Sequence, residues 1–600
     1  MQEVHLSQLI AIQALRYGNR RALLSRHDDG WQEISWQALA QWVEQVACSL
    51  VAMQVGEGEA IAVFAPNMAE VLAVNFGAYA AGAVVVPFFP SSSPQDVEFM
   101  LRDASVKVLF VGGQRQYDTA FPLFARLSTL RKMVLLDKSV CRHPMDTFSL
   151  LLDEFIGLGR GQRHVSEVAH RRSRATRHAL ADILYTSGTT GRSKGVQITY
   201  GMYAAAFRNN QPYLKISEQD QLLSFLPLNH IFERAWTYLA LSCGAAIAIN
   251  RDPRQVLQAM SEVHPTAMCA VPRFWEKVYA DVLHRAARRG VWAKAVLRTA
   301  LRQGHQYHVY CRGRGLQPSL GLRLRYMLAD RAVLAPIRKA LGLERGRIFP
   351  VAGASLSPVV EGFLHSCGIC MVAGYGLTET TATVSFDVLR QPFTLGSVGR
   401  VIQGMEVHIA QDGEILVRGE MVTKGYYRNP EETARALDAD GWFHTGDAGY
   451  LKNGELYLTD RIKNLYKTSN GKYIAPQQVE SALLVDRYID QVMVIADHRR
   501  FVSALIVPDY ELLRRYADRH GIKVEHREDM CRNGRILQFL QGRIDQLQAR
   551  LADYQRVKRF ILLSRPFSQE RNELTNTSKM KRDVIFDHNI DAIEKMYRES

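Results

Sequence analysis

The sequence predicts an α/β protein with a large N-terminal domain of layered α/β sheets, a small β-rich subdomain and a smaller α+β domain at the C-terminus. Strand-like and helix-like segments alternate in the first part of the chain, which is typical of a largely parallel sheet covered by helices. Short strands interrupted by glycines follow between residues 351 and 399. After residue 460 a new mixture of strands and charged helices begins, and roughly 140 residues are a normal length for a separate domain.

In chain order, hydrophobic periodicity predicts helices at 36–53 and 95–104 and strands at 60–64 and 107–111. The stretch 157–177 is rich in glycine, arginine and serine and has weak periodicity, so we expect a connecting loop there. Later segments are predicted as strands at 181–186, 407–409, 414–417, 491–496 and 503–507, and as helices at 512–520 and 536–553.

Composition excludes several classes of protein. The chain has 600 residues with 47% hydrophobic content, which is too long for one small core and too apolar for a disordered protein. Its eight cysteines are scattered, which favours a reducing compartment, and we expect Cys367 and Cys370 to be buried thiols rather than half a zinc site. The N-terminus has no signal-like pattern and no apolar run spans a bilayer. We therefore expect a cytoplasmic protein that is soluble or peripherally attached to a membrane.

Positive charge is concentrated in one segment. The formal net charge is +15, and residues 285–347 hold fifteen Lys and Arg against Asp330 and Glu344, a balance of +13. Such a segment can contact nucleic acid, an anionic membrane or an acidic ligand, or can be a solvated face. Few aromatics and no zinc-finger spacing argue against nucleic acid.

One predicted helix of this segment has opposed apolar and basic faces. The apolar face consists of Trp292, Val296 and Ala300, and the basic face of Lys294, Arg298 and Arg302. We expect this helix either to rest on an anionic membrane or to pack on the protein core with its basic side in solvent.

A glycine-rich loop follows the strand predicted at 181–186. The segment YTSGTTGRSKG, residues 185–195, combines three glycines, five hydroxyl side chains and a lysine. Glycines let backbone N–H groups approach a polyphosphate, hydroxyls donate further hydrogen bonds, and Lys194 supplies positive charge. The spacing is not that of a Walker loop, and an ordinary flexible loop is the alternative.

This loop resembles the signature phosphate loop of the acyl-adenylate-forming superfamily, the AMP-binding synthetases that include acyl-CoA synthetases. Further blocks resemble blocks of that family in the family's order, at residues 226–234, 271–279, 374–380, 441–447, 460–464 and 573–582. The resemblance implies ATP as a substrate and Mg²⁺ as a cofactor. It implies a phosphate site formed by Thr186, Ser187, Gly188, Thr189, Thr190, Gly191 and Lys194.

In the block at 374–380, the resemblance implies that Glu379 holds Mg²⁺, that Tyr375 lies against adenine beside Gly376, and that Thr378 hydrogen-bonds the α-phosphate. Glu379 is the only carboxylate there and stands among small and hydroxyl residues, which suits a hard cation. A core tyrosine and a helix-capping threonine are the alternatives.

Two further matches concern the nucleotide. The turn Gly353, Ala354 and Ser355 resembles the family's nucleotide turn, although the usual double glycine is here Ala352–Gly353. Asp447 can accept both ribose hydroxyls and Arg461 can donate to ribose or phosphate oxygens, as in the family. A structural salt bridge between Asp447 and Arg461 is the alternative, and it does not exclude the functional role.

Besides Glu379, two further residues are implied in catalysis. His230 matches a histidine that holds the acid's carboxylate or closes the thiol side of the site. Lys579 matches the adenylation lysine, whose ammonium stabilises charge on the reacting oxygens. The motif departs from the family at Asn576 and Ser578, and Lys581 is a rival. An ordinary hydrogen-bonded histidine and a solvent-facing basic tail are the alternatives.

The resemblance also implies a second half-reaction, in which CoA displaces AMP. The C-terminal domain is then mobile about a hinge at Lys463, and a loop with Asn470 and Gly471 lines the CoA tunnel. We place the N-terminal adenylation domain at 1–460 with a basic insert at about 280–347, the hinge at 461–465 and the C-terminal domain at 466–600.

The insert and the blocks at 226–234 and 468–477 resemble the long-chain subgroup, so we expect a long-chain fatty acid as substrate. Beside His230, we expect Glu233 and Arg234 to form a structural pair and Trp236 to line the acyl entrance. The alternatives are a fatty acyl-AMP ligase, a loader of an acyl carrier protein, an enzyme for a non-fatty acid, and a non-catalytic binding protein on the same fold. Acyl length and oligomeric state stay open.

Overall fold

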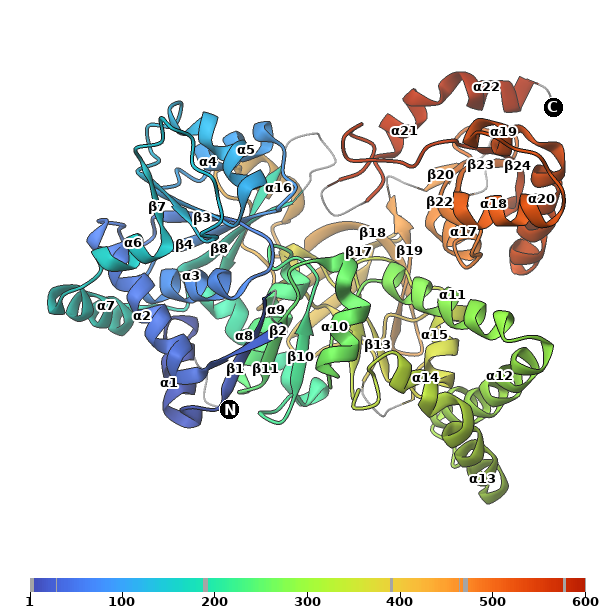
Figure 1. Cartoon of the computed structure of the whole chain (residues 1–600), viewed down its shortest axis with the longest axis horizontal. Helices are drawn as coiled ribbons and strands as arrows, with labels where there is room; N and C mark the ends of the chain where they lie inside the picture. The colour runs from blue at the N-terminus through green and yellow to red at the C-terminus, as the bar shows by residue number, and fades with distance from the viewer. Residues whose placement is uncertain are drawn as a thin grey trace.

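The structure is a computed structural model, and it describes residues 5–27, 30–186, 193–388, 392–462, 465–467, 473–575 and 579–598. Three sheets build the large N-terminal part, and two smaller sheets lie in the C-terminal part beside it (Figure 1). This arrangement confirms the predicted fold class.

The first sheet has seven strands in the order β7-β6-β5-β3-β4-β8-β9, and all neighbours are parallel except β8 and β9. The strands are β3 (Ala60–Phe64), β4 (Val84–Phe88), β5 (Val108–Val111), β6 (Lys132–Leu135), β7 (Ser149–Leu151), β8 (Leu180–Thr186) and β9 (Lys194–Thr199). In β3, Ile61 and Val63 belong to one core cluster, and Ala62 and Phe64 to another. Both faces are therefore covered, as a parallel sheet requires.

Helices supply these two covers. One cluster includes side chains of α1 (Leu6–Tyr17), α2 (Trp36–Ala52), α3 (Ala69–Ala80), α6 (Leu152–Leu158), α8 (Tyr200–Leu214) and α9 (Ile231–Ser242). The other includes side chains of α4 (Pro94–Asp103) and α5 (Gln114–Phe124).

The second sheet has four strands in the order β10-β11-β1-β2. The loop that leads to α9 follows its strand β10. The strands are β1 (Arg21–His27), β2 (Gly30–Ser35), β10 (Gln221–Ser224) and β11 (Ala246–Ile249), and α10 (Val256–Val263) follows β11. Because β10 ends at Ser224, the loop 225–230 starts at a sheet edge and ends at the first turn of α9.

The third sheet has eight strands in the order β12-β13-β14-β15-β19-β18-β17-β16. The strands are β12 (Phe349–Val351), β13 (Met371–Tyr375), β14 (Ser385–Phe386), β15 (Arg400–Val401), β16 (Met405–Ile409), β17 (Glu414–Gly419), β18 (Phe443–Lys452) and β19 (Glu455–Arg461). The helices α15 (Pro358–Ser366) and α16 (Pro430–Ala436) belong to this part of the chain. The predicted β-rich subdomain is thus the antiparallel end of a larger sheet that begins with the parallel pair β12 and β13.

The basic insert is a group of helices that projects from the N-terminal part (Figure 1). It contains α11 (Pro272–Arg288), α12 (Val291–Gly304), α13 (Leu320–Ala329) and α14 (Ala335–Ala340). In the C-terminal part, β22 (Ile489–Ile495), β23 (Val502–Pro508) and β24 (Val557–Leu562) form a three-stranded sheet, and β20 (Tyr466–Lys467) pairs with β21 (Tyr473–Ile474). Its helices are α17 (Pro476–Leu483), α18 (Tyr510–Arg519), α19 (Arg527–Arg532), α20 (Gly534–Leu547), α21 (Arg582–His588) and α22 (Ile590–Arg598).

The prediction of a loop at 157–177 is wrong, because α7 (Gln162–Arg174) occupies most of this stretch. Only Val168 of this helix is buried, so the apolar periodicity that signals a helix is absent. Arginines hold the helix instead: Arg171 donates to the carbonyl oxygens of Val55 and Ala81, and Arg172 pairs with Glu44.

Smaller differences concern helix length and faces. The helix predicted at 536–553 ends at Leu547. On α12, Leu297 and Ala300 are buried whereas Trp292 and Val296 are exposed, so the predicted apolar face is only partly buried. Cys367 is buried as predicted, and Cys370 is half-buried. In the described part of the chain, no helix has the length and apolar character needed to cross a membrane.

Candidate active site

The predicted phosphate loop joins β8 to β9. Thr186 and Lys194 are paired across this hairpin, and Ser187, Gly188, Thr189, Thr190 and Gly191 between them lie outside the described residues. The Lys194 ammonium donates a hydrogen bond to Glu432 on α16 and lies 5.3 Å from the centre of the Tyr426 ring. Thr186 and Lys194 therefore fix the base of the loop, and Lys194 has an acidic partner that the sequence did not indicate.

Tyr426 connects Lys194 to Glu379. The backbone around Tyr426 runs beside β9, since Tyr427 donates its N–H to the carbonyl of Gly195 at 2.7 Å. The Tyr426 hydroxyl donates to Oε1 of Glu379 at 3.0 Å. Burial raises the pKa of Glu379, and the hydrogen bond from Tyr426 opposes this shift. The structure thus brings the predicted metal ligand close to Lys194, at the base of the phosphate loop.

The predicted nucleotide contacts gather on three strands of the third sheet. The Tyr375 hydroxyl, at the end of β13, donates to Oδ2 of Asp447 at 2.8 Å. Asp447 on β18 and Arg461 on β19 are paired across the sheet, and Arg461 Nε lies 3.2 Å from Oδ1 of Asp447. The salt bridge that the sequence analysis gave as the alternative is therefore present. It leaves further guanidinium N–H groups of Arg461 for a ligand.

Two predicted glycines have backbone reasons for being glycine. Gly353 has a φ of +92°, in the left-handed region, and lies with Ala354 and Ser355 in the turn after β12. A Cβ atom on Gly376 would lie 1.9 Å from the carbonyl oxygen of Ala382, so only glycine fits there. Thr378 is half-buried at the start of a short 3₁₀ turn, Thr378–Thr380.

Lys579 reaches this group of residues from the C-terminal part. Its backbone N–H donates to Oγ1 of Thr575 at 3.0 Å, and Leu574 pairs with Met580, so the lysine sits on one arm of a tight hairpin. Surrounding protein atoms and Arg461 lower the pKa of the Lys579 ammonium, while Asp447 and Glu379 raise it. The residue as a whole remains exposed to solvent.

Lys581, the alternative candidate for the adenylation lysine, donates instead to the side chain of Asn572 in the same hairpin. Contact between the two parts of the chain includes Arg273 of α11, whose guanidinium donates to Oδ1 of Asp490 at 2.6 Å. Lys463, Asn470 and Gly471 lie outside the described residues.

His230 caps the N-terminus of α9 and faces the same region. Its Nδ1 accepts a hydrogen bond from the N–H of Phe232 at 3.2 Å, which places the proton of the neutral ring on Nε2. Burial lowers the pKa of His230 to about 4, with a further contribution from Lys579. The imidazole is therefore uncharged at neutral pH, with an N–H that can donate.

The predicted pair of Glu233 and Arg234 is wrong. Consecutive residues of a helix point about 100° apart, and the two side chains enter different networks. Arg234 donates through Nε and Nη2 to both oxygens of Asp182 on β8, at 2.9 and 2.8 Å, and through Nη1 to the carbonyl of Leu228 at 3.1 Å. Tyr79 and Tyr203 also donate to Asp182.

The buried ion pair of Arg234 and Asp182 connects two predicted parts of the site. Asp182 lies on the strand that leads into the phosphate loop, and Arg234 holds the loop that carries His230. Neither side chain is accessible to solvent, and the donors are satisfied by carboxylate, hydroxyl and carbonyl oxygens. Such a network fixes geometry because breaking it leaves a buried charge without a partner.

Glu233 enters a different network, and none of its hydrogen-bond partners in the described part of the chain is a cation. Its carboxyl accepts from Thr237 Oγ1 and from the N–H of Leu226, both at 3.1 Å, and from Cys269 Sγ at 3.3 Å. Burial raises the pKa of Glu233 to about 7. Between about pH 4.5 and 7 the folded protein keeps a proton that the unfolded chain releases.

We therefore expect Glu233→Gln to change the pH dependence of stability. In the wild type, this carboxyl makes stability fall as pH rises through that window, by about 1.4 kcal/mol per pH unit at most. The glutamine variant loses this contribution, so its free energy of unfolding relative to wild type should rise from pH 5 to pH 7 and level off above. Denaturant titrations of both proteins from pH 5 to 8 measure it. A difference that is constant with pH would contradict the assigned shift.

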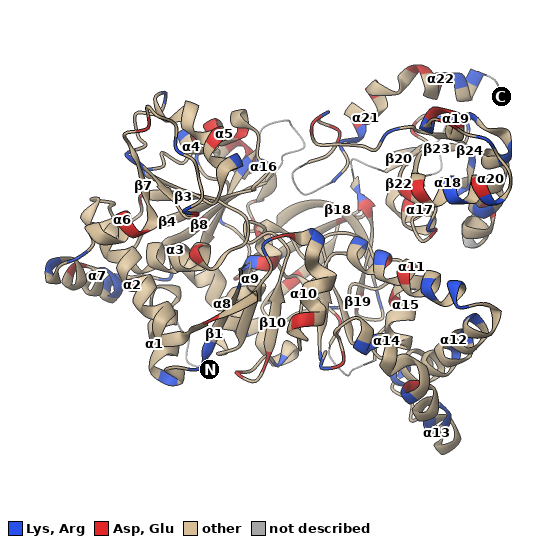
Figure 2. Ribbon diagram, viewed as in Figure 1, with Lys and Arg blue, Asp and Glu red and all other residues tan. Residues whose placement is uncertain are grey.

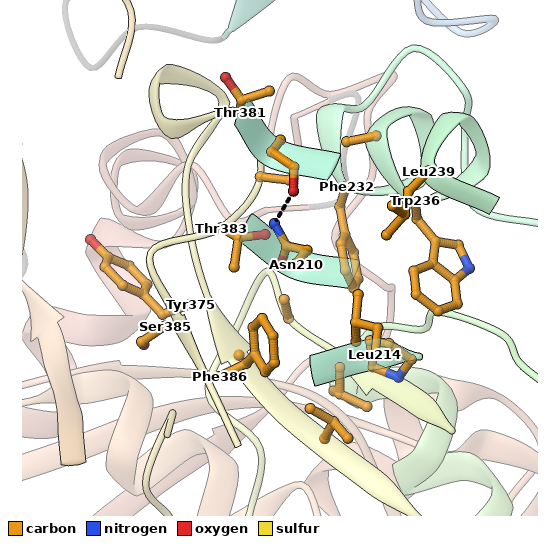
Figure 3. Close-up of a pocket in the computed structure, with 18 of the residues that line it drawn as sticks. Asn210, Leu214, Phe232, Trp236, Leu239, Tyr375, Thr381, Thr383, Ser385 and Phe386 are labelled. Carbon is orange, nitrogen blue, oxygen red and sulfur yellow. Dashed lines mark hydrogen bonds between the residues drawn. The ribbon is translucent and has the colours of Figure 1, made fainter. Parts of the chain in front are cut away.

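An apolar cavity opens beside Tyr375. It encloses about 570 Å³ including its open mouth, between α8, α9 and the strands β12 to β14. Figure 3 shows Phe232, Trp236 and Leu239 on one side, Phe386 and Tyr375 on the other, and Leu214 between them. Trp236 is thus one of the lining residues. Because Tyr375 also touches Asp447, the cavity adjoins the predicted nucleotide contacts.

Comparison with known proteins places the chain in a family. The model for AMP-binding enzymes matches residues 10–427, and the model for the AMP-binding enzyme C-terminal domain matches residues 464–600. The chain belongs to the AMP-binding enzyme family. Long chain acyl-CoA synthetase 7, peroxisomal, of Arabidopsis thaliana is 30% identical and covers 96% of this chain and 83% of the relative. Long-chain-fatty-acid–CoA ligase FadD15 of Mycobacterium bovis is 29% identical over 95% of this chain and 93% of the relative.

Two solved structures of other proteins share the fold. The adenylation domain of a carboxylate reductase from Mycobacterium chelonae superposes with a TM-score of 0.75 at 21% identity, covering 100% of this chain and 92% of that one. The anthranilate CoA ligase AuaEII, solved with anthranoyl-AMP, has a TM-score of 0.73 at 17% identity, with 98% of each chain covered. At these identities the likeness concerns the fold alone.

Sequence reasoning missed three members of the site, Tyr426, Glu432 and Asp182. Tyr426 and Glu432 are more than 200 residues from Lys194 in the sequence and reach it through the segment beside β9. No local motif marks them, and only pairing between distant segments reveals their place. The binding and catalytic roles of the site residues stay predictions.

Proposed function

We propose that this AMP-binding enzyme is a long-chain fatty acid–CoA ligase. It converts ATP and a fatty acid to acyl-AMP and pyrophosphate, and then transfers the acyl group to CoA with release of AMP. The observation that carries the proposal is the gathering of Lys579, Asp447 and Arg461 near Tyr375, which also lines an apolar cavity. Two relatives named for long-chain acyl-CoA synthesis support the substrate class.

In the first step, a carboxylate oxygen attacks the α-phosphorus of ATP, and the bond to the bridging oxygen breaks as pyrophosphate leaves. Negative charge grows on the reacting oxygens, and the Lys579 ammonium lowers the barrier by stabilising it. Asp447 accepts from the ribose hydroxyls, and Arg461 donates to ribose or phosphate oxygens. The Tyr375 ring packs against adenine.

The donor set around Glu379 fits Mg²⁺. Tyr426 engages Oε1 of Glu379, and the other carboxylate oxygen is available to a hard cation. No group of three His, Cys, Asp or Glu residues in the described chain could hold a metal by itself. This suits an ion held by one carboxylate together with phosphate oxygens and water. Glu379 would hold Mg²⁺, which would neutralise charge on the phosphates, and Lys194 would leave Glu432 to contact a phosphate oxygen.

In the second step, the CoA thiol loses its proton to solvent, its sulfur attacks the acyl carbon, and the acyl–oxygen bond breaks as AMP leaves. His230 is neutral at pH 7, because its pKa is lowered to about 4, and its Nε2–H can donate to the carbonyl oxygen of the acyl group. The C-terminal domain rotates about Lys463, withdraws Lys579 and brings the loop with Asn470 and Gly471 to the thiol path. That rotation breaks the ion pair of Arg273 and Asp490.

We expect Ala235→Phe to shift the acyl-chain preference. Ala235 lines the cavity from α9, and an aromatic ring there occupies space that a long chain needs. The kcat/KM for C16 acid should fall by about tenfold or more, which corresponds to about 1.4 kcal/mol, whereas that for C8 acid should change little. The C8 reaction is an internal control for folding. An equal loss for both acids would contradict an acyl site in this cavity.

A panel of fatty acids from C6 to C20, assayed with ATP, Mg²⁺ and CoA, tests the proposed function. We expect AMP and acyl-CoA in equal amounts, with the highest kcat/KM among the long-chain acids. Product with an acyl carrier protein but not with free CoA would contradict the acceptor. Turnover of only an aromatic or amino acid would contradict the substrate. We also propose a cytoplasmic location and, independently of which acid is activated, peripheral membrane contact through the basic insert at 280–347.

A further inference from the structure

The helix α13 of the basic insert exposes an apolar stripe. Leu320, Leu324, Met327 and Leu328 are 82%, 55%, 58% and 61% exposed. They occupy positions i, i+4, i+7 and i+8, which fall on one face of a helix. Isolated exposed leucines need no explanation, but four on one face of a ten-residue helix form a continuous surface.

The opposite face of α13 is anchored to the protein. Leu322 is buried, and the Tyr326 ring stacks on Tyr307 with 4.2 Å between ring centres. The Tyr326 hydroxyl lies 2.8 Å from Nε2 of His308. These contacts fix the rotation of the helix about its axis, so the leucine face is directed outward by the fold.

Arginines flank the apolar stripe. Arg323 and Arg325 lie on either side of it, and Arg312 and Arg314 are exposed in the preceding turn. Residues 312–329 contain no Asp or Glu, and Asp330, just beyond, is paired with Arg338 at 2.7 Å. Figure 2 shows basic residues along the projecting helices α11 to α13. On α12, which packs beside α13, Trp292 is also exposed.

We propose that α13 docks this protein onto an anionic lipid bilayer. The stripe would enter the boundary between head groups and acyl chains, and the flanking arginines would contact lipid phosphates, as in amphipathic helices that lie in a membrane surface. Two other partners fit less well. Nucleic acid offers phosphates but no apolar layer for four large side chains. A second copy of the chain would place its own arginines against these arginines, without acidic residues to balance their charge.

The docking surface lies in a part of the chain remote in sequence from the predicted catalytic residues. Delivery of the fatty acid by the bilayer rests on the proposed function, whereas docking of α13 does not. Binding can therefore be measured without turnover, and the two proposals can fail separately.

Flotation of the full-length protein with extruded vesicles tests this proposal. We expect binding to phosphatidylcholine–phosphatidylglycerol vesicles, weaker binding to phosphatidylcholine alone, and loss of the difference at high salt. Leu320→Gln/Leu324→Gln and Arg323→Gln/Arg325→Gln should each weaken binding to the anionic vesicles by about tenfold or more. The matched control is Leu15→Gln on α1, since Leu15 is 90% exposed but isolated, and it should bind as the wild type does.

Unchanged thermal midpoints show that the variants are folded. Equal binding by the Leu320/Leu324 double variant and the wild type would overturn the proposal. Binding to duplex RNA or DNA without binding to vesicles would overturn it as well. So would a concentration-dependent dimer in sedimentation velocity that the same variant abolishes, because the stripe would then be an interface between copies.

Discussion

Lys579→Ala is expected to slow acyl-adenylate formation by about 100-fold or more, because one preorganised donor at a developing oxyanion is worth that much. The ammonium lies among Arg461, Asp447 and Glu379, where the nucleotide contacts meet. Thioester formation from supplied acyl-AMP and CoA should be much less affected, since no bond to the α-phosphorus forms or breaks in that step. Rapid-quench measurement of pyrophosphate release, and of acyl-CoA from supplied acyl-AMP, separates the two steps.

Lys581→Ala is the matched control for this prediction. Lys581 stands two positions away in the same hairpin but is hydrogen-bonded to Asn572. It should lose much less adenylation activity than Lys579→Ala. If the two variants lost adenylation equally, or if Lys579→Ala lost both half-reactions to the same extent, the assignment of Lys579 would be contradicted.

Arg234→Met is expected to destabilise the N-terminal domain by about 3–5 kcal/mol, because it leaves the carboxylate of Asp182 buried without its cation. Arg234 and Asp182 are both inaccessible to solvent and form two hydrogen bonds with each other. The loss also frees the carbonyl of Leu228, two residues before His230. Denaturant-induced unfolding followed by circular dichroism measures the stability change.

Two comparisons sharpen this prediction. Arg254→Met removes an arginine whose side chain is 90% exposed beside Asp252, and it should leave the free energy of unfolding nearly unchanged. Adding Asp182→Asn to Arg234→Met removes the uncompensated charge and should recover part of the lost stability. Similar costs for Arg234→Met and Arg254→Met would show that the buried pair does not hold the domain together.

Much of the fold was predictable because the hydrophobic periodicity of a segment matches the faces that the structure buries. The strand at 60–64 and the helices at 36–53 and 95–104 have the periodicity that their burial requires, and the structure places them within one or two residues. The helix α7 was missed because it buries one apolar side chain and is held by arginine hydrogen bonds to distant carbonyls. Pattern reasoning has no signal for such a helix.

The candidate site was predictable where residues cluster in motifs and unpredictable where contacts join distant segments. Glu379, Tyr375 and Gly376 share one short block, so a single match places all three. Arg234 was assigned the wrong partner because its true partner, Asp182, lies 52 residues away on another element. The outward leucines of α13 could have been found from their spacing, but periodicity alone does not say which face is covered.

The most direct test of the central claim uses fatty acid labelled with ¹⁸O in both carboxyl oxygens. If one carboxylate oxygen attacks the α-phosphorus and CoA then breaks the acyl–oxygen bond, each turnover transfers one ¹⁸O to AMP. We predict AMP with one ¹⁸O and acyl-CoA with the other, in a single turnover with ATP, Mg²⁺ and CoA. Unlabelled AMP, or ADP and phosphate as the nucleotide products, would contradict activation of the acid through an acyl-adenylate.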